Sequence, residues 1–354
     1  MKLLMITRKI DRNDALAGFA WNWVKKIGEN LDKLYVISWQ LGDASGLPKN
    51  IEVIFLPDQG KIKKVFILWY RLIKILPKVD GLFCHMNPEY TILSAPLAKI
   101  FGKYVVSWYT HKQVNWRRRL MELLANKIIT ASTASFRSPL FPKKVAVIGH
   151  GIDVDKFKSL KSKVESQGNF NIVSVGRISP TKDYESIIKA LDILRDKNIK
   201  LKIIGDVILE FQRQYLSSLK EMVKTMSLDD QVEFIGWIPN QNMPAYYQQT
   251  DLFINMSGTG SVDKVVLEAM SCGCLVLTSN EAFETILPQE LMTVKNNPHQ
   301  LAEKIKWLKS LSDDRKNQIR LELRQEVVEN HNLNKLAIKI LNQFIPFVIA
   351  RKQK

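Results

Sequence analysis

The sequence predicts an α/β protein with two doubly wound parallel sheets, each in its own domain. Short runs rich in Val and Ile, bounded by Gly, Pro or Asp, alternate with amphipathic stretches in both halves of the chain. Such alternation is typical of parallel sheets that carry helices on both faces. A polar segment over 159–169 interrupts the pattern before it restarts. A length of 354 residues also favours two domains over one.

In the first half, strands are expected over 2–7, 34–39, 51–56, 81–85, 104–108, 127–131 and 144–148. Helical patterns lie between them, over 15–30, 63–76, 90–101 and 116–125.

In the second half, strands are expected over 171–175, 200–204, 232–235, 252–255, 275–278 and 291–294. Helices are expected over 184–197, 211–226, 243–249, 265–271 and 298–311. We therefore expect a first domain over 1–160, a second over 161–332, and a helical segment over 333–354.

The composition is that of an ordinary globular protein, with 46% hydrophobic and 25% charged residues. Its three cysteines, Cys84, Cys272 and Cys274, form no Cys-x-x-Cys pair, so neither a zinc site nor a disulfide framework is expected. We expect the three cysteines to be small buried thiols of a protein in a reducing cytoplasm. The apolar run near the start ends at Arg8, too early for a signal peptide, and no stretch approaches a membrane span of about 20 apolar residues. A cytoplasmic protein is the expectation.

The positive charge is concentrated in the first half of the chain. The net charge is +17, and residues 1–150 hold 24 Lys/Arg against 10 Asp/Glu, a surplus of 14. An asymmetry of this kind points to an anionic partner for the first half. The chain shows no helix-turn-helix, zinc finger or aromatic sheet motif, so nucleic acid is not the expected partner.

Two segments of the second half each have the pattern of a buried strand that opens through a small-residue loop into a helix. The first, over 173–182, reads VSVGRISPTK, and the second, over 257–273, reads SGTGSVDKVVLEAMSCG. Loops around Gly176, Gly258 and Gly260 would present backbone N–H groups and the positive end of a helix dipole, which suit a phosphate. Together the two loops predict a site for a diphosphate and the sugar attached to it.

These motifs resemble the nucleotide-sugar domain of the retaining glycosyltransferases of family 4, the glycosyl transferases group 1. The resemblance is carried by Gly-Arg at 176–177, by Lys182 and by Leu-Glu-Ala-Met-x-Cys-Gly at 267–273. It extends over nearly the whole chain, because 1–7 resembles the family's first strand and 149–157 its interdomain segment. The resemblance implies the GT-B fold, in which two Rossmann-like domains face each other across a cleft. The segment over 333–354 would then cross back to the first domain.

The resemblance implies catalytic roles for Arg177 and Lys182. A guanidinium and an ammonium would grip the diphosphate and stabilise the negative charge that develops on the leaving nucleoside diphosphate. They would replace the metal ion of other glycosyltransferases, so neither a metal nor a cofactor is expected. The alternative is a solvated Arg and Lys at a helix start. In the family, the Glu that matches Glu268 accepts hydrogen bonds from the nucleotide ribose; otherwise Glu268 is a carboxylate stabilised by the helix dipole.

The sequence departs from the family pattern eight residues before Glu268. A second Glu that contacts the donor sugar usually stands there, and this chain has Gly260. We hypothesise that Asp263, or the N–H groups from Gly260 to Lys264, hold the donor hydroxyls instead. The alternative for Asp263 is an ordinary helix N-cap.

Five further residues are candidates for the same site. His111 follows a buried strand, and the family often has a His there that contacts the donor sugar. His150 replaces the family's usual Asn, and Gly18 belongs to a loop that closes over the donor diphosphate in the family. Trp237 would stack on the nucleobase or pack on the domain edge. His85 is a weaker candidate for the acceptor side.

The segment over 61–78 is basic and carries three aromatic residues, and 116–119 reads Trp-Arg-Arg-Arg. Together they could form a surface that rests on anionic lipid. The alternative is a buried domain helix with a solvated basic face. A peripheral location on the inner face of the cell membrane would suit the first alternative.

The resemblance implies a metal-independent enzyme that transfers a hexose, with retention of anomeric configuration, from a UDP- or GDP-linked sugar to a glycan or lipid-linked acceptor, as in polysaccharide biosynthesis. Three alternatives stay open. They are a nucleotide-sugar epimerase on the same fold, a degenerate glycosyltransferase that has lost activity with the Glu at position 260, and a basic membrane-associated binding protein.

Overall fold

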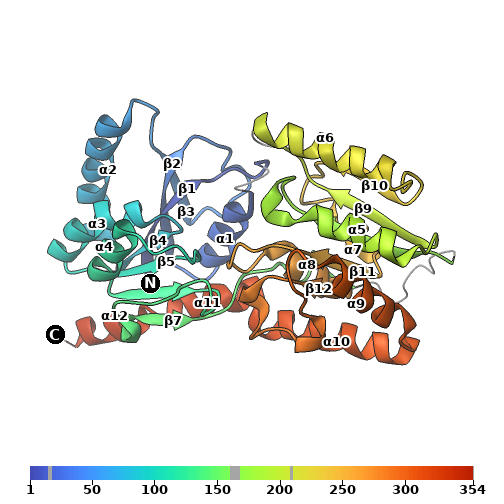
Figure 1. Cartoon of the computed structure of the whole chain (residues 1–354). Coiled ribbons are helices and arrows are strands. Elements are labelled where there is room, and N and C mark those ends of the chain that lie inside the picture. The colour runs from blue at the N-terminus through green and yellow to red at the C-terminus, as the bar shows by residue number, and fades with distance from the viewer. Residues whose placement is uncertain (15–17, 160–167, 208–209, 354) are drawn as a thin grey trace. The chain divides into compact units, whose positions relative to one another are not determined.

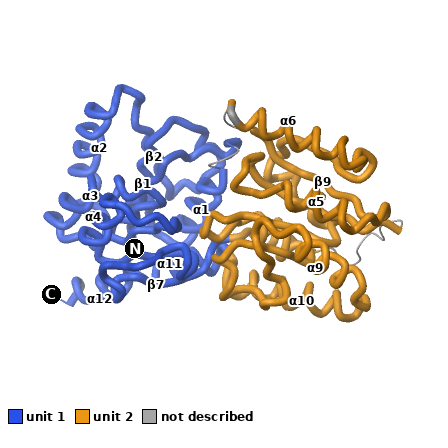
Figure 2. The backbone as a smooth tube through the Cα atoms, viewed as in Figure 1, with its two compact units in different colours: residues 1–151, 333–354 blue, residues 152–332 orange. Residues whose placement is uncertain are grey.

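The structure is a computed structural model, and it describes residues 1–14, 18–159, 168–207 and 210–353. The chain forms two compact units, one made of Met1–Gly151 with Leu333–Lys354 and the other of Ile152–Asn332 (Figure 2). The first unit therefore ends nine residues before the boundary at 160 that the sequence predicts. The segment from Ile152 to Ser159 belongs to the second unit.

The first unit contains a seven-stranded parallel sheet with the strand order β3-β2-β1-β4-β5-β6-β7 (Figure 1). Its strands are β1 Lys2–Lys9, β2 Lys33–Gln40, β3 Ile51–Phe55, β4 Gly81–His85, β5 Tyr104–Trp108, β6 Lys127–Thr130 and β7 Val145–Val147. Its helices are α1 Gly18–Gly28, α2 Lys61–Ile75, α3 Pro88–Ile100, α4 Trp116–Leu124, α11 Leu333–Asn342 and α12 Ile345–Lys352.

The second unit repeats this architecture with a five-stranded parallel sheet in the order β10-β9-β8-β11-β12. Its strands are β8 Phe170–Val175, β9 Ile199–Ile204, β10 Val232–Gly236, β11 Leu252–Asn255 and β12 Leu275–Thr278. Its helices are α5 Tyr184–Leu194, α6 Glu210–Thr225, α7 Met243–Gln248, α8 Lys264–Ser271, α9 Pro298–Ser310 and α10 Asp313–Asn330.

In both sheets the order in which successive strands are added reverses next to the first strand of the unit. In the first unit β1 lies between β2 and β4, and in the second β8 lies between β9 and β11. The carboxyl ends of β1 and β4, and of β8 and β11, are therefore the topological switch points, where helices leave on opposite faces and open α/β sheets bind their ligands. The strands end there because their apolar cores, such as Leu3–Ile6 in β1, are fully buried and polar residues follow.

One predicted strand and one long helix differ from the sequence analysis. The segment over 291–294 forms only an isolated bridge between Met292 and Thr278, because the Val294 amide donates to Gln300 Oε1 at 2.7 Å and no ladder continues. Helix α10 was not predicted. It is charged on nearly every side and buries only a narrow stripe, which consists of Ile319, Leu323 and Val327.

The final helical segment belongs to the first unit. Phe344 is fully buried, and a Cβ added to Gly81 of β4 would lie 2.5 Å from its ring. The stretch Leu333–Arg351 is long and apolar enough to cross a membrane, with mean hydropathy 1.3 and 33% of it buried. The expectation that no stretch reaches that length was therefore wrong. One such stretch does not by itself indicate a membrane span, because core helices of folded proteins can have the same length and hydropathy.

Candidate functional site

The loop after β8 is shaped by two glycines that touch each other. A Cβ on Gly205, at the end of β9, would lie 1.9 Å from the Gly176 carbonyl oxygen, a distance that no side chain can occupy. The Tyr184 hydroxyl donates to the same carbonyl at 3.0 Å. Backbone therefore packs on backbone here, and this packing fixes the course of the chain from Gly176 to Lys182.

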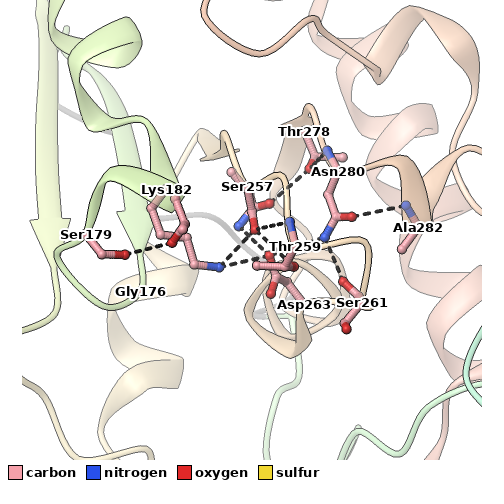
Figure 3. Close-up of polar contacts among 12 residues, drawn as sticks. Gly176, Ser179, Lys182, Ser257, Thr259, Ser261, Asp263, Thr278, Asn280 and Ala282 are labelled. Atoms are coloured by element: carbon pink, nitrogen blue, oxygen red, sulfur yellow. Dashed lines mark hydrogen bonds and ion pairs between the residues drawn. The ribbon is translucent and has the colours of Figure 1, made fainter. Parts of the chain in front are cut away.

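Lys182 points across the switch point of the second unit. Its short 3-10 turn ends at Asp183, which has a left-handed backbone (φ 46°) and caps α5 by accepting from the Ser186 amide. The Lys182 ammonium lies 3.0 Å from Asp263 Oδ2 and 3.2 Å from Ser257 Oγ (Figure 3). A cation is thus held at the carboxyl ends of β8 and β11.

Asp263 is the centre of a hydrogen-bond network at this edge of the sheet. Its Oδ2 also accepts from Asn255 Nδ2 at 3.2 Å and from Asn280 Nδ2 at 3.3 Å. Thr278 in turn donates to Asn255 Oδ1 at 3.1 Å. Asp263 stands at the N-cap position of α8, but its side chain makes no capping hydrogen bond. Its carboxylate holds the cation and the two amides instead, so the N-cap alternative applies to its backbone position only.

Two backbone amides of the loop over 257–260 already donate to acceptors within the protein. Gly258 N–H donates to the Thr181 carbonyl at 3.4 Å, and Thr259 N–H lies 3.4 Å from Ser257 Oγ. The small-residue pattern predicts N–H groups that are open to a ligand, but two of them already have acceptors. Gly260 has φ 66°, a conformation that glycine adopts without strain.

Glu268 is buried on the first turns of α8, with 7% of its surface exposed. Its carboxylate accepts from Asn240 Nδ2 at 3.3 Å and from the Tyr247 hydroxyl at 3.2 Å. Burial raises the pKa of Glu268, and the nearby Lys264 acts in the opposite direction. Burial lowers the pKa of Lys264 to about 7, and the negative charge of Glu268 acts in the opposite direction. The pair provides a carboxylate and an amine whose charges depend on each other.

Arg177 and Trp237 are on the surface of the second unit. Arg177 is exposed and makes no hydrogen bond or ion pair among the residues that the structure describes. Its guanidinium is therefore available to an anion. Trp237 is 49% exposed and follows Gly236, whose φ is 83°.

The other predicted site residues belong to the first unit, where most are packed rather than open. His150 is buried beside Trp23 and Trp108, and its Nδ1 accepts from the Gly151 amide at 2.8 Å. His85 is buried too, with Nδ1 3.0 Å from the Thr7 hydroxyl.

His111 is exposed and meets the Tyr109 ring edge to face at 5.4 Å. Gly18 begins α1, and its amide donates to the Asp14 carbonyl at 2.9 Å. Part of the loop before it, residues 15–17, lies outside the described residues.

Sequence reasoning missed Ser257, Asn255 and Asn280 as members of the site network. Asn255 ends β11, and Asn280 lies two residues beyond β12. Polar residues at the ends of adjacent parallel strands meet at one edge of the sheet, and this signal was available from the predicted strands.

No group of three or more His, Cys, Asp or Glu is arranged to hold a metal ion among the described residues. The chain does contain one Asp-x-Asp sequence, Asp153-Val154-Asp155. Asp153 accepts from the Lys156 amide at 3.1 Å, and Asp155 is exposed.

Residues 155–325 match the model of one protein family, described as glycosyl transferases group 1. The alpha-monoglucosyldiacylglycerol synthase of Streptococcus pneumoniae is 29% identical over 150 residues, 39% of this chain and 33% of that protein. The mannosylfructose-phosphate synthase of Agrobacterium fabrum is 25% identical over 142 residues, 37% and 31% of the two chains. The match thus spans about a third of the length of these relatives.

Solved structures share the fold of nearly the whole chain. Anabaena HepE in complex with UDP-glucose is 18% identical, has a TM-score of 0.76 and is matched over 98% of this chain and 100% of that one. The sucrose-phosphate synthase of Thermosynechococcus elongatus is 14% identical with a TM-score of 0.76, over 99% of each chain. These similarities show the two-domain GT-B fold.

Proposed function

We propose that this chain, whose residues 155–325 match the glycosyl transferases group 1 family, is a retaining glycosyltransferase. It moves a hexose from a nucleoside diphosphate sugar to a glycan or lipid-linked acceptor. The observation that supports this most directly is the Lys182 ammonium, held by Asp263 and Ser257 at the switch point of the second unit. A switch point is where a doubly wound sheet binds a nucleotide, and an ammonium there suits a diphosphate.

Lys182 and Arg177 act on the leaving group in this proposal. The bond between the anomeric carbon and the diphosphate oxygen breaks, and the two cations stabilise the charge that collects on the diphosphate. The acceptor hydroxyl forms its bond to the anomeric carbon on the same face, and its proton passes to the departing diphosphate oxygen. Retention follows from attack on the face that the leaving group vacates, and no metal ion takes part.

Glu268 binds the ribose of the donor. Its carboxylate already accepts from a hydroxyl and an amide donor, so it is oriented to accept hydroxyl hydrogens. Asp263 and the neighbouring backbone take over the sugar contacts that the family's other Glu makes, because Gly260 stands in its place.

We propose UDP as the nucleotide, in keeping with the UDP-glucose in the Anabaena HepE structure. The acceptor class is supported by the names of relatives. One is named as the synthase of a monoglucosyldiacylglycerol lipid, and a Campylobacter jejuni relative, 24% identical over 225 residues, is named as a transferase acting on a diphospho-undecaprenol-linked sugar.

A second candidate is a protein that binds the nucleotide and does not transfer. Gly260 favours it, because the Glu that contacts the donor sugar in the family is missing. Lys182 in its ion pair with Asp263 would still bind a diphosphate.

The test is a thermal-shift titration with UDP, GDP, ADP and dTDP, in wild type, Arg177→Ala and Lys189→Ala. A ligand that binds only the folded protein raises its stability by about 2.7 kcal/mol at a hundred times Kd. We expect stabilisation by UDP that is lost in Arg177→Ala and kept in Lys189→Ala, which removes an exposed cation of α5 outside the Lys182–Asp263 network. An absence of stabilisation by all four nucleotides would contradict both candidates.

Turnover separates the two candidates. Hydrolysis or transfer of UDP-glucose that falls in both Glu268→Ala and Asp263→Ala supports the transferase and the role of Asp263. Full turnover in Asp263→Ala, with none in Glu268→Ala, would disprove the Asp263 hypothesis alone. Nucleotide binding without any turnover would support the second candidate. Activity that disappears with EDTA and returns with Mg²⁺ would contradict the metal-free mechanism.

A further inference from the structure

Helix α2 carries a stripe of apolar side chains on its outer face. Ile62, Phe66, Trp69, Tyr70 and Ile73 are 78%, 62%, 38%, 53% and 52% exposed. Their spacing of three or four residues places them on one side of the helix. We refer to these five residues as the α2 stripe. Contiguous exposed apolar surface on a folded protein marks a binding surface.

The opposite side of α2 already has its packing partners. Leu68, Leu72 and Ile75 are buried in the core of the first unit together with strands β1 and β4. Lys64 is also buried, with its ammonium 3.3 Å from Asp58 and 5.6 Å from the centre of the Trp39 ring. Apart from Trp69, whose indole Nε1 donates to the Leu93 carbonyl at 3.0 Å, the α2 stripe takes no part in this core, and the helix lies on the outside of its unit (Figure 1).

The charge around the α2 stripe has one sign. The helix contains five Lys/Arg and no Asp/Glu. Lys61, Lys63, Arg71 and Lys74 are exposed, and Lys63 and Lys74 lie next to the stripe at helical spacing. Apolar and aromatic residues on one side, with Lys and Arg along the margin, are the composition of a helix that lies in a membrane interface.

We propose that α2 docks the first unit onto an anionic lipid bilayer. The α2 stripe enters the boundary between headgroups and acyl chains, and the flanking cations bind the lipid phosphates. The tyrosine and tryptophan stand at the depth where amphipathic rings are favoured.

Charge argues for lipid over the other occupants of such a surface. The first unit holds 29 Lys/Arg against 10 Asp/Glu, whereas the second holds 23 against 25. A second copy docked symmetrically would bring two α2 helices with five cations each together, which is repulsive. Nucleic acid would match the cations and leave the five apolar side chains in water.

The basic pattern of the sequence also places residues 116–119 on this surface, but not all four of them are exposed. Trp116 and Arg117 are exposed, but Arg118 is fully buried in an ion pair with Glu122 at 3.1 Å. We therefore restrict the docking surface to α2.

The test is sedimentation of the full chain with vesicles of phosphatidylglycerol and, separately, of phosphatidylcholine, without donor or acceptor. We expect binding to the anionic vesicles that weakens steeply with salt. Phe66→Ser and Ile73→Ser should each lower the vesicle affinity by about tenfold. Lys63→Glu should lower it by about fivefold or more, because each basic residue near an anionic surface contributes about that factor.

Two variants of the second unit serve as controls. Leu321→Ser removes a side chain that is 68% exposed on α10, and Lys189→Glu reverses an exposed charge on α5. Both should bind vesicles like wild type, and circular dichroism should show every variant folded. The proposal would be overturned if Phe66→Ser and Ile73→Ser left the vesicle affinity unchanged, or if wild type did not bind anionic vesicles at low salt. A dimer that these two substitutions dissociate, in a chain that does not bind vesicles, would assign the α2 stripe to a second copy instead.

Discussion

The two units have the same kind of switch point and fill it with opposite chemistry. Where β1 and β4 end, the first unit packs Thr7 and His85 beneath Trp23, whose ring lies 4.9 Å from that of His85. Where β8 and β11 end, the second unit places Lys182 against Asp263. The topology is shared, so it supplies the place for a ligand and the residues that follow the strands supply the chemistry.

Charge separates the two units as clearly. The first carries a surplus of 19 positive charges, and the second has two more acidic than basic residues. The second unit holds one cation, Lys182, in an ion pair at its switch point, whereas the cations of the first unit are spread over exposed helices such as α2. A concentrated charge suits a small anion, and a spread charge suits an extended anionic surface.

The strongest test of this comparison is Trp23→Ala in the first unit. Trp23 is fully buried between His85 and Trp108, and its removal should cost about 4 kcal/mol of unfolding free energy. Denaturant unfolding measures that loss. The stabilisation of the second unit by UDP should remain, and its disappearance would show that the aromatic cluster supports the donor site.

Lys182→Ala tests the cation of the second unit. Removing a group that stabilises a developing charge should lower transfer from the donor by about a hundredfold to a thousandfold. Initial rates of UDP release measure this effect, with Lys189→Ala as the matched lysine control. Equal rates in Lys182→Ala and wild type would mean that the ion pair with Asp263 has a structural role only.

Alanine substitutions at two glycines of the second unit would separate the effect of close packing from that of backbone strain. Both Gly205 and Gly236 have positive φ, at 149° and 83°, but only at Gly205 would a Cβ collide with backbone, whereas at Gly236 it would meet nothing within 4 Å. Gly205→Ala should cost about 3 kcal/mol and disturb nucleotide binding. Gly236→Ala should cost about 1 kcal/mol. Similar losses of thermal stability in the two variants would contradict the close contact with Gly176.

The smallest expected effect is the pH dependence that Lys264 gives the second unit. Burial lowers the pKa of folded Lys264 to about 7, whereas the unfolded chain keeps its ordinary value of 10.5. Between these values the unfolded state binds more protons, so stability rises with pH. Melting temperatures of wild type relative to Lys264→Met should therefore rise by a few degrees from pH 7 to pH 9. A flat difference would show that Lys264 is well hydrated.

Much of this architecture was predictable because the apolar runs are short and clearly bounded. Strands such as Gly81–His85 and Leu252–Asn255 agree with the observed bounds at every residue. Helix α10 was missed because only Ile319, Leu323 and Val327 mark its buried side, although Ser312 is a good N-cap and accepts from the Arg315 amide. Hydrophobic periodicity is a weak guide when the buried stripe is one residue wide.

The sequence indicated which residue types belong to the candidate site, but it did not indicate which partners surround them or how deeply they are buried. Lys182 and Asp263 were chosen separately, and nothing in their spacing of 81 positions shows that they form an ion pair. His150 was expected to be open to the donor, and it is buried because two tryptophans far away in sequence pack on it. Long-range partners of this kind follow from tertiary packing, which local patterns do not encode.

The return of the chain to the first unit has a consequence for biosynthesis. The second unit is one continuous stretch, Ile152–Asn332, whereas the first is completed by α11 and α12. During translation the second unit can fold as soon as it leaves the ribosome, while Gly81 and its neighbours wait for Phe344 to cover them. The part of the chain that is made first is therefore the last to be finished.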